Sequence, residues 1–305
     1  MYLVGHDVAR TVGQHRGTAS PGPDFRQYRA AVAELVTEIR RGAEQDGRSA
    51  ERILLGRLDE RPFTVVLAAT PAGHDATAGQ LLTEVRDYRQ DPRCTAAGLA
   101  GLVRIAMLAQ IDTIWWGRMP AYQTDSDVLE SSDLVDLDEL RLSGQLRFSY
   151  RSQPATLLTR AARSAERHTW PRRAPRTAGL WLPKGRPQVV AWLDQLAAEF
   201  AEISPPGTPW LWVNSLARSV AHQRHLKTLG YLALLPSSHC VGYGADIEMA
   251  WYRRFRAHRV LRGLLLDRQR AGEVNVINEG QAWHVCLSPQ VVAGPRRVLR
   301  PQLSS

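Results

Sequence analysis

The stretch SSHCVGYGAD, residues 237–246, decides the interpretation of this chain, because it places two metal-binding side chains on either side of glycines. His239 and Asp246 lie seven residues apart, and in a straight strand they would point to opposite faces. Gly242 and Gly244 remove that objection, since glycine permits a bend or bulge that turns both side chains toward one point. A histidine nitrogen and a carboxylate oxygen both bind zinc at about 2.0–2.2 Å. The two residues are therefore candidate metal ligands.

A third ligand is expected from AWHVCL, residues 282–287, which is typical of a strand and carries His284. Three protein ligands are the usual number in a catalytic zinc site, where water takes the fourth position. The chain has nine histidines, and spacing alone is weak evidence that His239 and His284 are the ones that bind a metal. Three others lie on predicted helices, where a core or solvated position is the better interpretation, and we expect no catalytic role for them: His222, His225 and His258.

The residues around this stretch predict a mixture of helices and short strands, an α+β fold. A helix is predicted over 188–203, a strand in WLWVNS, a helix over about 218–229 and a long basic amphipathic helix ending near 271. The segments VNVIN and AWHVCLS predict two more strands, which favours a small antiparallel sheet.

The first half of the chain is predicted to be mainly helical. Residues 24–44 have apolar side chains at helical spacing, at Val32, Leu35, Val36 and Ile39. The run FTVVLAAT at 63–70 is expected to be a strand or a buried helix end. For the acidic residues of 125–139 we favour a solvated helix face with caps over a calcium loop, since Leu and Val interleave the carboxylates. Further helices are predicted over 76–89, 95–111 and 154–168.

A segment rich in proline and arginine, around 168–187, suggests a domain boundary because it is a poor helix or central strand. Its basic arm could touch a polyanion. However, packing of the tryptophans in and beyond it onto a domain surface is the better interpretation: Trp170, Trp181 and Trp192. The predicted division is a helical region of unknown function over 1–169, a linker over 170–187, a C-terminal domain over 188–295 and a basic tail over 296–305.

Composition is that of an ordinary globular protein. Of 305 residues, 44% are hydrophobic and 23% charged, and no run approaches the ~18 apolar residues needed to span a bilayer. No secretory signal is readable, so a cytoplasmic location is expected. Three cysteines imply no disulfide framework. The net charge of +9 favours acidic partners, with nucleic acid the less favoured one, and says nothing of oligomeric state.

Three segments together resemble the D-Ala-D-Ala carboxypeptidases and dipeptidases, the VanY/VanX-like zinc peptidases that are grouped with lysostaphin-type and Hedgehog-like domains. SSHCVGYGAD is similar to the signature S-x-H-x-x-G-x-A-x-D, with Gly244 where alanine is usual. VNSLARSVAHQ, residues 213–223, resembles V-x-S-x-x-R-S-x-x-x-Q, and Trp283-His284 resembles the W-H of a closing E-x-W-H motif. The resemblance covers about residues 188–290 and nothing before them.

The resemblance implies a Hedgehog/D-Ala-D-Ala-peptidase-like domain with zinc as its cofactor. Arg218 would polarise the scissile carbonyl and stabilise developing negative charge. A zinc-activated water would attack a peptide, and a general base would take its proton. The implied metal ligands are His239, Asp246 and His284, and the implied substrate-binding residues are Ser215, Gln223 and Ser237.

One departure concerns the general base. The catalytic glutamate of the family lies three residues before the last histidine, where this chain has Gln281, and an amide cannot accept the proton. Glu279 is the nearest carboxylate and the preferred candidate, if a turn at Gly280 brings it to the metal. Glu248 is the second candidate, although it is also placed to complement the start of a helix.

The cysteines near the ligands leave a further alternative open. Cys240 adjoins His239, and Cys286 shares a strand face with His284, so a closed structural zinc site using Cys286 is conceivable. Small buried thiols beside a metal site are the preferred interpretation.

Two functions are therefore expected. The first is a zinc metallopeptidase acting on peptides with D-amino acids, of the kind found in peptidoglycan. The second is a catalytically inactive binding module that keeps the fold and recognises a polyanion or a protein partner, which the missing family glutamate would explain.

Overall fold

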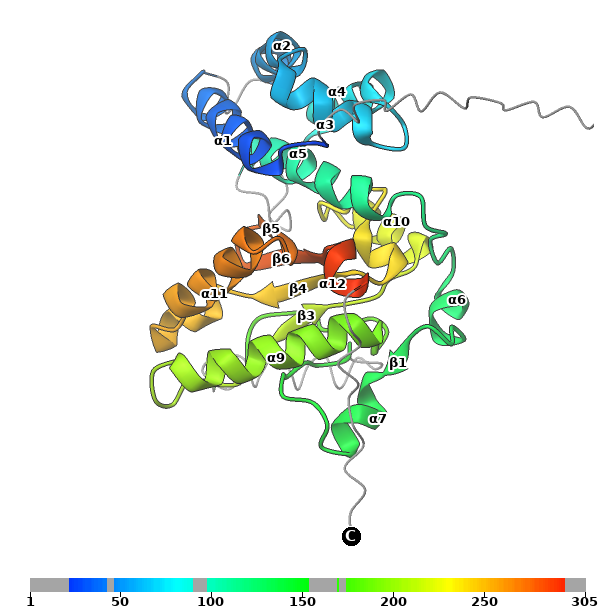
Figure 1. Ribbon diagram of the computed structural model, residues 1–305, viewed down its shortest axis with the longest axis vertical. Coiled ribbons are helices and arrows are strands. Elements are labelled where there is room, and N and C mark those ends of the chain that lie inside the picture. The colour runs from blue at the N-terminus through cyan, green and yellow to red at the C-terminus, as the bar shows by residue number, and fades with distance from the viewer. Residues whose placement is uncertain (1–21, 43–46, 90–97, 154–168, 170–173, 294–305) are drawn as a thin grey trace, which may run out of the picture.

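The computed structural model describes residues 22–42, 47–89, 98–153, 169 and 174–293 (Figure 1). Within these residues the protein combines many helices with small antiparallel sheets, which confirms the α+β prediction. The helix predicted over 154–168, Trp170 and the tail over 296–305 lie outside the described residues.

The first helices pack around one hydrophobic core. They are α1 (Phe25–Gly42), α2 (Gly47–Leu58), α3 (Arg61–Ala69), α4 (His74–Asp87) and α5 (Gly98–Trp116). The predicted apolar face of α1 is buried in this core. FTVVLAAT lies in α3 and not in a strand, because its largest apolar side chains, Phe63, Val66 and Leu67, recur at helical spacing and are buried. Pro62 is tolerated because it lies in the first turn of the helix.

The acidic residues of 125–139 cap two short helices, as expected. Asp127 completes a capping box with Thr124 at the start of α6 (Asp125–Leu129). Asp136 accepts two backbone N–H bonds at the start of α7 (Leu137–Leu142). A carboxylate at a helix N-terminus satisfies otherwise unpaired amides and complements the helix dipole.

A four-stranded antiparallel sheet forms the second half of the molecule. Its strands lie in the order β3 (Val213–Ser215), β4 (Gly244–Glu248), β6 (Ala282–Leu287) and β5 (Val274–Asn278). The connecting elements are α9 (Pro187–Ile203), α10 (Val220–Thr228), the 3₁₀ helices η1 (Ser238–Val241) and η2 (Trp251–Phe255), α11 (His258–Arg270) and α12 (Pro289–Ala293).

The two faces of this sheet have different coverings. Apolar residues that alternate along the strands, such as Ile247, Val276 and Val285, share a core with α9 and α11. The residues between them, including Asp246 and His284, face the opposite way, toward η1 and α5. Figure 1 shows α5 lying across that side of the sheet. The metal-site candidates are therefore enclosed between the sheet and the helical region.

The sheet core also draws on residues before the proline- and arginine-rich segment. Trp116, at the end of α5, stacks on Tyr243 at 3.7 Å between ring centroids. Phe148 and Tyr150 belong to the same core. The described part of the proline- and arginine-rich segment packs onto the domain: β2 (Lys184–Gly185) pairs with β1 (Val135–Asp136).

The tryptophans of that region pack in the way the sequence favoured. The Trp181 ring stacks on His222 at 5.0 Å, and its indole N–H donates to Asp125. Trp192 is buried in the core of the sheet and donates to Glu273. Both rings therefore pack against the protein, Trp192 in the core and Trp181 at the surface, where it is 45% exposed.

Among the described helices, α5 is the one whose length and hydropathy would suit a membrane span. It is also the central helix of the first core, with 56% of its most apolar window buried. Its apolar character is accounted for by that packing, so the described residues contain no clear transmembrane segment.

Candidate metal centre

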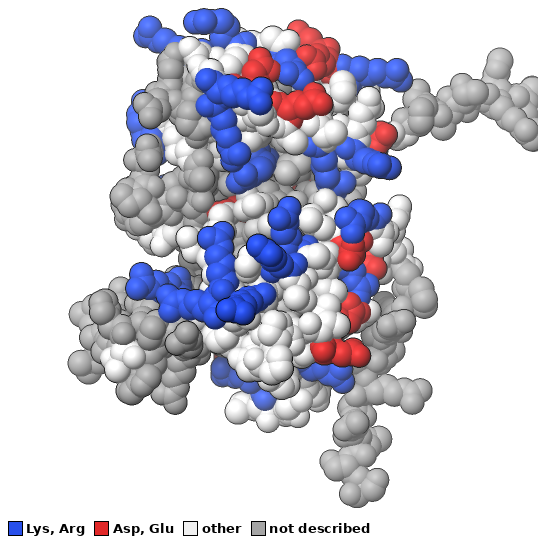
Figure 2. Space-filling model, turned by 90° about the vertical axis from the view of Figure 1, so that its left-hand side faces the viewer, with Lys and Arg blue, Asp and Glu red and all other residues white. Residues whose placement is uncertain are grey.

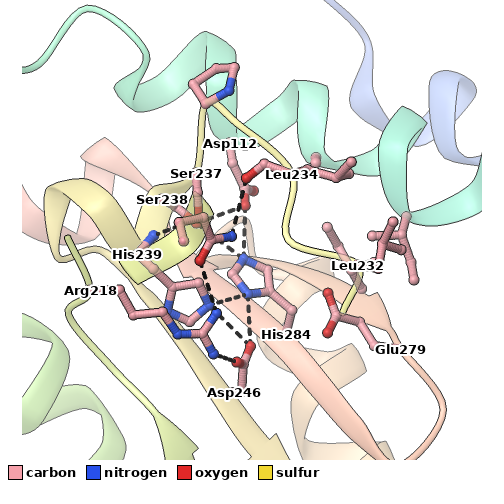
Figure 3. Close-up of a pocket in the computed structure, with 15 residues that line it drawn as sticks. Asp112, Arg218, Leu232, Leu234, Ser237, Ser238, His239, Asp246, Glu279 and His284 are labelled. Carbon is pink, nitrogen blue, oxygen red and sulfur yellow. Dashed lines mark hydrogen bonds and ion pairs between the residues drawn. The ribbon is translucent and has the colours of Figure 1, made fainter. Parts of the chain in front are cut away.

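Three predicted ligands converge on one point, as Figure 3 shows. His239 Nε2, His284 Nδ1 and Asp246 Oδ1 form a triangle in which each pair of atoms is 3.1 Å apart. All three residues are buried. They are brought together from a 3₁₀ helix and two neighbouring strands.

Strand register and one left-handed glycine produce this convergence. Asp246 on β4 is directly opposite His284 on β6, so their side chains leave the same face of the sheet side by side. His239 lies in η1, which ends at Gly242 with φ of +80°. That conformation, which glycine adopts without a Cβ penalty, turns the chain from η1 into β4. The predicted bend at Gly242 is confirmed.

The triangle has the size of one face of a tetrahedral metal site. Ligand atoms in an ideal zinc tetrahedron lie about 3.3–3.4 Å apart, given bonds of about 2.0–2.1 Å. The separations of 3.1 Å between the three atoms are close to that spacing, so these atoms would suit three of the four ligand positions of such a site. The buried group can therefore hold a metal ion.

Each histidine has its remaining ring nitrogen occupied, which fixes which nitrogen faces the ligand triangle. His239 Nδ1 lies 2.8 Å from the carbonyl oxygen of Leu216, so Nδ1–H donates and Nε2 is free to bind a cation. His284 Nε2 lies 2.9 Å from Asp112 Oδ2, so Nε2–H donates and Nδ1 faces the triangle. Outer partners of this kind orient metal-bound imidazoles and raise their basicity.

Asp112 is the functional residue that sequence reasoning missed. It lies on α5, is buried, and also accepts from Ser238 Oγ at 3.0 Å and from Asn275 Nδ2 at 2.8 Å. Arg29 on α1 donates to Asn275 Oδ1 at 3.0 Å, which extends the network into the helical region. A lone carboxylate in the apolar sequence of α5 was the available signal, because a buried carboxylate requires partners.

The charges of the triangle depend on one another. Burial opposes the ionised form of Asp246, but His239 and Arg218 outweigh it and hold its pKa well below the usual range. Burial also opposes protonation of His284, yet Asp112 and Asp246 raise its pKa to about 10. In the metal-free protein a proton on His284 therefore compensates the carboxylates. A cation bound to the triangle would take over that compensating charge.

Arg218 lines the cavity beside the triangle. Its Nη2 donates to Asp246 Oδ2 at 2.6 Å, which leaves Oδ1 toward the histidines. Its Nη1 lies 3.3 Å from Gln223 Oε1, and Gln223 in turn donates to the carbonyl of Leu234. The two residues thus lie together at the site, and Gln223 holds the guanidinium in place.

The two serines have different positions. Ser237 lines the cavity, and its hydroxyl accepts a hydrogen bond from the backbone N–H of His239. Ser215 is buried on β3 opposite Asp246 and is not among the lining residues. Ser215 therefore supports the strand that carries a ligand and does not face the cavity.

Of the two candidate general bases, Glu279 lies at the cavity and Glu248 does not. Glu279 lines the cavity, and Figure 3 shows its carboxylate directed into it. Burial and the charge of Asp246 raise the pKa of Glu279 to about 7. Glu248 instead accepts from the backbone N–H of Trp251 and the side chain of Asn214, and lies outside the lining residues. Its predicted role at the start of the following helix is confirmed.

The thiols do not join the ligand triangle. Cys240 and Cys286 are buried and free, and neither belongs to the group of candidate ligand atoms among the described residues. Burial raises the pKa of Cys286 well above its usual value, and Asp112 adds to this effect. The described part of the chain therefore gives no support to a closed site using Cys286, and small buried thiols beside the candidate site stay the preferred interpretation.

His222 has a structural position. It is buried on α10 against Trp181, and burial lowers its pKa to about 4, so it is a neutral packing residue.

The cavity above the triangle is small, about 60 Å³. Ile105, Ala109 and Asp112 recur along one face of α5 and form one wall. Leu232 and Leu234, from the loop after α10, form another (Figure 3). Few water molecules fit in such a volume. The helical region is thus part of the site and not only attached to it.

No protein family matches this chain, and the comparisons with curated proteins and with solved structures found no similar protein.

Proposed function

We propose that this protein is a zinc-dependent peptidase of the D-Ala-D-Ala carboxypeptidase and dipeptidase type, with a Hedgehog-like domain. One observation supports this above all. A buried His-Asp-His triangle shares a small cavity with an arginine and a glutamate whose pKa lies near neutrality. A metal, an electrophilic cation and a proton acceptor are the groups that peptide hydrolysis requires.

Zinc is the metal that this donor set favours. Two imidazole nitrogens and one carboxylate oxygen are a common catalytic zinc set, whereas calcium and magnesium prefer six or more oxygen atoms. Both histidines have outer hydrogen-bond partners, as zinc-binding histidines usually do. When bound, zinc supplies Lewis acidity and lowers the pKa of a coordinated water.

Glu279 is assigned as the general base. It is the carboxylate that lines the cavity without belonging to the ligand triangle or to the hydrogen bonds behind it. A pKa near 7 suits a group that must accept and return a proton near neutral pH. Glu279 would take the proton of the attacking water and deliver it to the leaving amine.

Arg218 is assigned to the substrate carbonyl. Its guanidinium is held by Asp246 and Gln223, so little reorganisation is needed when negative charge develops on the carbonyl oxygen. The fixed position also orients the peptide across the cavity. Ser237 lies at the edge of the same cavity, where its hydroxyl could contact the substrate backbone.

Hydrolysis of short peptides by the zinc-loaded protein tests the proposal. Peptides ending in D-Ala-D-Ala are compared with their L-Ala-L-Ala counterparts. Glu279→Gln and Arg218→Lys are expected to lower kcat by about 10²-fold or more while zinc content stays the same. Glu248→Gln is the matched control and is expected to keep its activity. Equal turnover by wild type and both cavity variants would exclude the proposed roles.

A second candidate function has its own support in the surface charge. Exposed arginines follow η2 and α11: Arg253, Arg256, Arg259 and Arg262. Figure 2 shows Lys and Arg side chains gathered on the face of the molecule where α11 lies. Such a surface would bind a polyanion, and binding would weaken steeply with salt. Binding of nucleic acid or an anionic glycan that is salt-dependent and lost in an Arg259→Gln/Arg262→Gln variant would favour this function.

A further inference from the structure

A second cavity lies beside the metal cavity. Its volume is about 400 Å³, against about 60 Å³ for the metal cavity. Pockets that hold small organic molecules usually measure about 300–1,000 Å³, so the second cavity has the size of a ligand site and the first holds only a few waters. The residues that line both cavities form a common wall: Asp112, Pro236, Ser237 and Ser238.

The walls of the second cavity are largely apolar and partly fixed in place. Trp116, Val220 and Val241 are buried where they line it. The Trp116 ring stacks on Tyr243 at 3.7 Å, and its indole N–H donates to the carbonyl of Leu287. This wall is therefore held by the protein itself, as is usual for a preformed pocket that takes an apolar group.

The buried charge of the common wall is already compensated. One carboxylate oxygen of Asp112 accepts hydrogen bonds from His284 and Ser238. The other oxygen accepts from Asn275. Cys240 also lines the second cavity, and burial raises its pKa to about 11, so it is a neutral thiol there. The inner part of the cavity therefore favours apolar atoms over a charged group.

An arginine lies at the open end of the second cavity. Arg224 on α10 lines it and is exposed, as is Pro236, so these residues mark the side that opens to solvent. In the described part of the chain, no ion pair or hydrogen bond joins the guanidinium of Arg224 to another residue. On the same helix, Lys227 is paired with Glu84 at 2.6 Å. An occupant with an apolar stem and an anionic end matches both the walls and this cation.

We infer that the second cavity is the subsite for a substrate side chain with an apolar stem and an anionic end, on a residue close to the scissile bond. This step rests on the proposed function. The metal cavity has room for the reacting group alone, so the rest of a peptide needs the adjoining space. Because α5 supplies Trp116 and Asp112 to that space, the helical region takes part in selecting the substrate.

Binding of a small ligand tests the subsite without requiring turnover. Hexanoate is titrated into the metal-free full-length protein and followed by ligand-detected NMR, beside acetate, which lacks the chain, and 1-hexanol, which lacks the charge. Hexanoate is expected to bind saturably and at least about tenfold more tightly than acetate, because its additional CH₂ groups are buried. Arg224→Gln is expected to weaken hexanoate by about threefold or more and to leave hexanol unchanged.

A variant that fills the cavity tests its location. Ala121→Phe adds a ring to the lining and is expected to weaken hexanoate binding by about tenfold or more. Ala191→Phe on α9, also half-buried but outside the lining residues, is the matched control and should bind as wild type does. Ala121→Leu adds less volume and keeps the test valid if the phenylalanine variant fails to fold.

Three results of these titrations would overturn the subsite. They are no saturable binding of hexanoate to wild type, acetate binding as tight as that of hexanoate, and equal hexanoate binding by wild type and a folded Ala121 variant.

Turnover separates this inference from the proposed function. Peptides X-D-Ala-D-Ala are compared in which X is α-aminoadipate, norleucine or lysine, whose aliphatic stems end in an anionic, a neutral or a cationic group. The zinc-loaded protein is expected to have a kcat/KM about tenfold higher for aminoadipate than for lysine, and Arg224→Gln to remove most of that preference. Equal kcat/KM for the three peptides would overturn the assignment of the cavity to the substrate. If no peptide is hydrolysed, the peptidase proposal fails, while the NMR titration still decides whether the cavity binds such a ligand.

Discussion

Single residues set the orientation of the metal ligands. Each histidine of the triangle donates from its outer nitrogen, His239 to a backbone carbonyl and His284 to the carboxylate of Asp112. Of these two partners only Asp112 is a side chain, and it also holds Ser238 and Asn275. Its removal can therefore be tested without changing any ligand.

Asp112→Asn is expected to weaken metal binding by about 10- to 100-fold, because the amide no longer accepts a charge-assisted hydrogen bond from His284. Affinity is measured by competition with a chromogenic chelator. Asp59→Asn, an exposed carboxylate between α2 and α3, serves as the control and should leave affinity unchanged. An Asp112→Asn protein with wild-type affinity would mean that the ligand is oriented by packing alone.

The raised pKa of Glu279 makes the free energy of unfolding of the metal-free protein depend on pH. Its folded-state pKa, about 7, lies above its ordinary 4.5, so protonation of Glu279 stabilises the metal-free protein. That contribution is complete below pH of about 4.5 and is lost as the pH rises through about 7. Glu279→Gln mimics the protonated form, and it is expected to raise the free energy of unfolding relative to wild type at pH 8 but not near pH 4.5.

Denaturant unfolding of both metal-free proteins across this pH range measures the difference. Glu202→Gln, an exposed residue of α9, is the control and should show no such trend. A stabilisation that is the same at both pH values would show that Glu279 does not titrate in this window.

At the scale of elements, the close approach of η1, β4 and β6 leaves no room at Gly244. A Cβ there would lie 2.8 Å from Ser238 Oγ, 2.9 Å from the backbone nitrogen of His239 and 3.0 Å from His284 Cε1. The alanine found at this position in the signature that the chain resembles therefore does not fit here. Two of these neighbours are the metal ligands themselves.

Gly244→Ala is consequently expected to displace His239 or His284 and to lower metal affinity by about tenfold or more. The matched control is Gly263→Ala on α11, where a Cβ meets nothing within 4 Å and stability should increase by about 0.5–1 kcal/mol. Chelator competition and thermal unfolding are measured on both. Unchanged affinity in Gly244→Ala would show that η1 can shift without loss of the site.

Local elements were largely predictable from the sequence, because each has a periodic or capping signal. The buried face of α1, the strands β5 and β6 and the bend at Gly242 followed from such patterns. The triangle was predictable because two of its ligands lie in one short segment and the third on a recognisable strand. FTVVLAAT was ambiguous, since a short β-branched run has no period that separates strand from buried helix.

At the scale of the whole molecule, the site is shared between the helical region and the sheet. His284 and Asp112 are 172 residues apart in the chain, and Arg29 on α1 reaches Asn275 on β5. Contacts over such separations have no signature in a single sequence, because they depend on how finished elements pack. For that reason the helical region could be predicted as helices but not as part of the cavity wall.

Metal binding is accordingly expected to stabilise both parts of the molecule. Amide hydrogen exchange should slow in β4 and β6 and also in α5 around Asp112, since α5 supplies the outer partner of His284. The helix α2, which lies outside the network, should exchange at the same rate with and without metal. Protection confined to the sheet would contradict a shared site.

The metal content of the purified protein tests the His-Asp-His site without any assumption about substrate. Elemental analysis of wild type is compared with His239→Ala and with His225→Ala, an exposed histidine of α10 outside the triangle. We expect about one zinc per chain in wild type and in His225→Ala, and loss of that zinc in His239→Ala. No zinc in wild type even after metal is added back, or full retention in His239→Ala, would contradict that expectation.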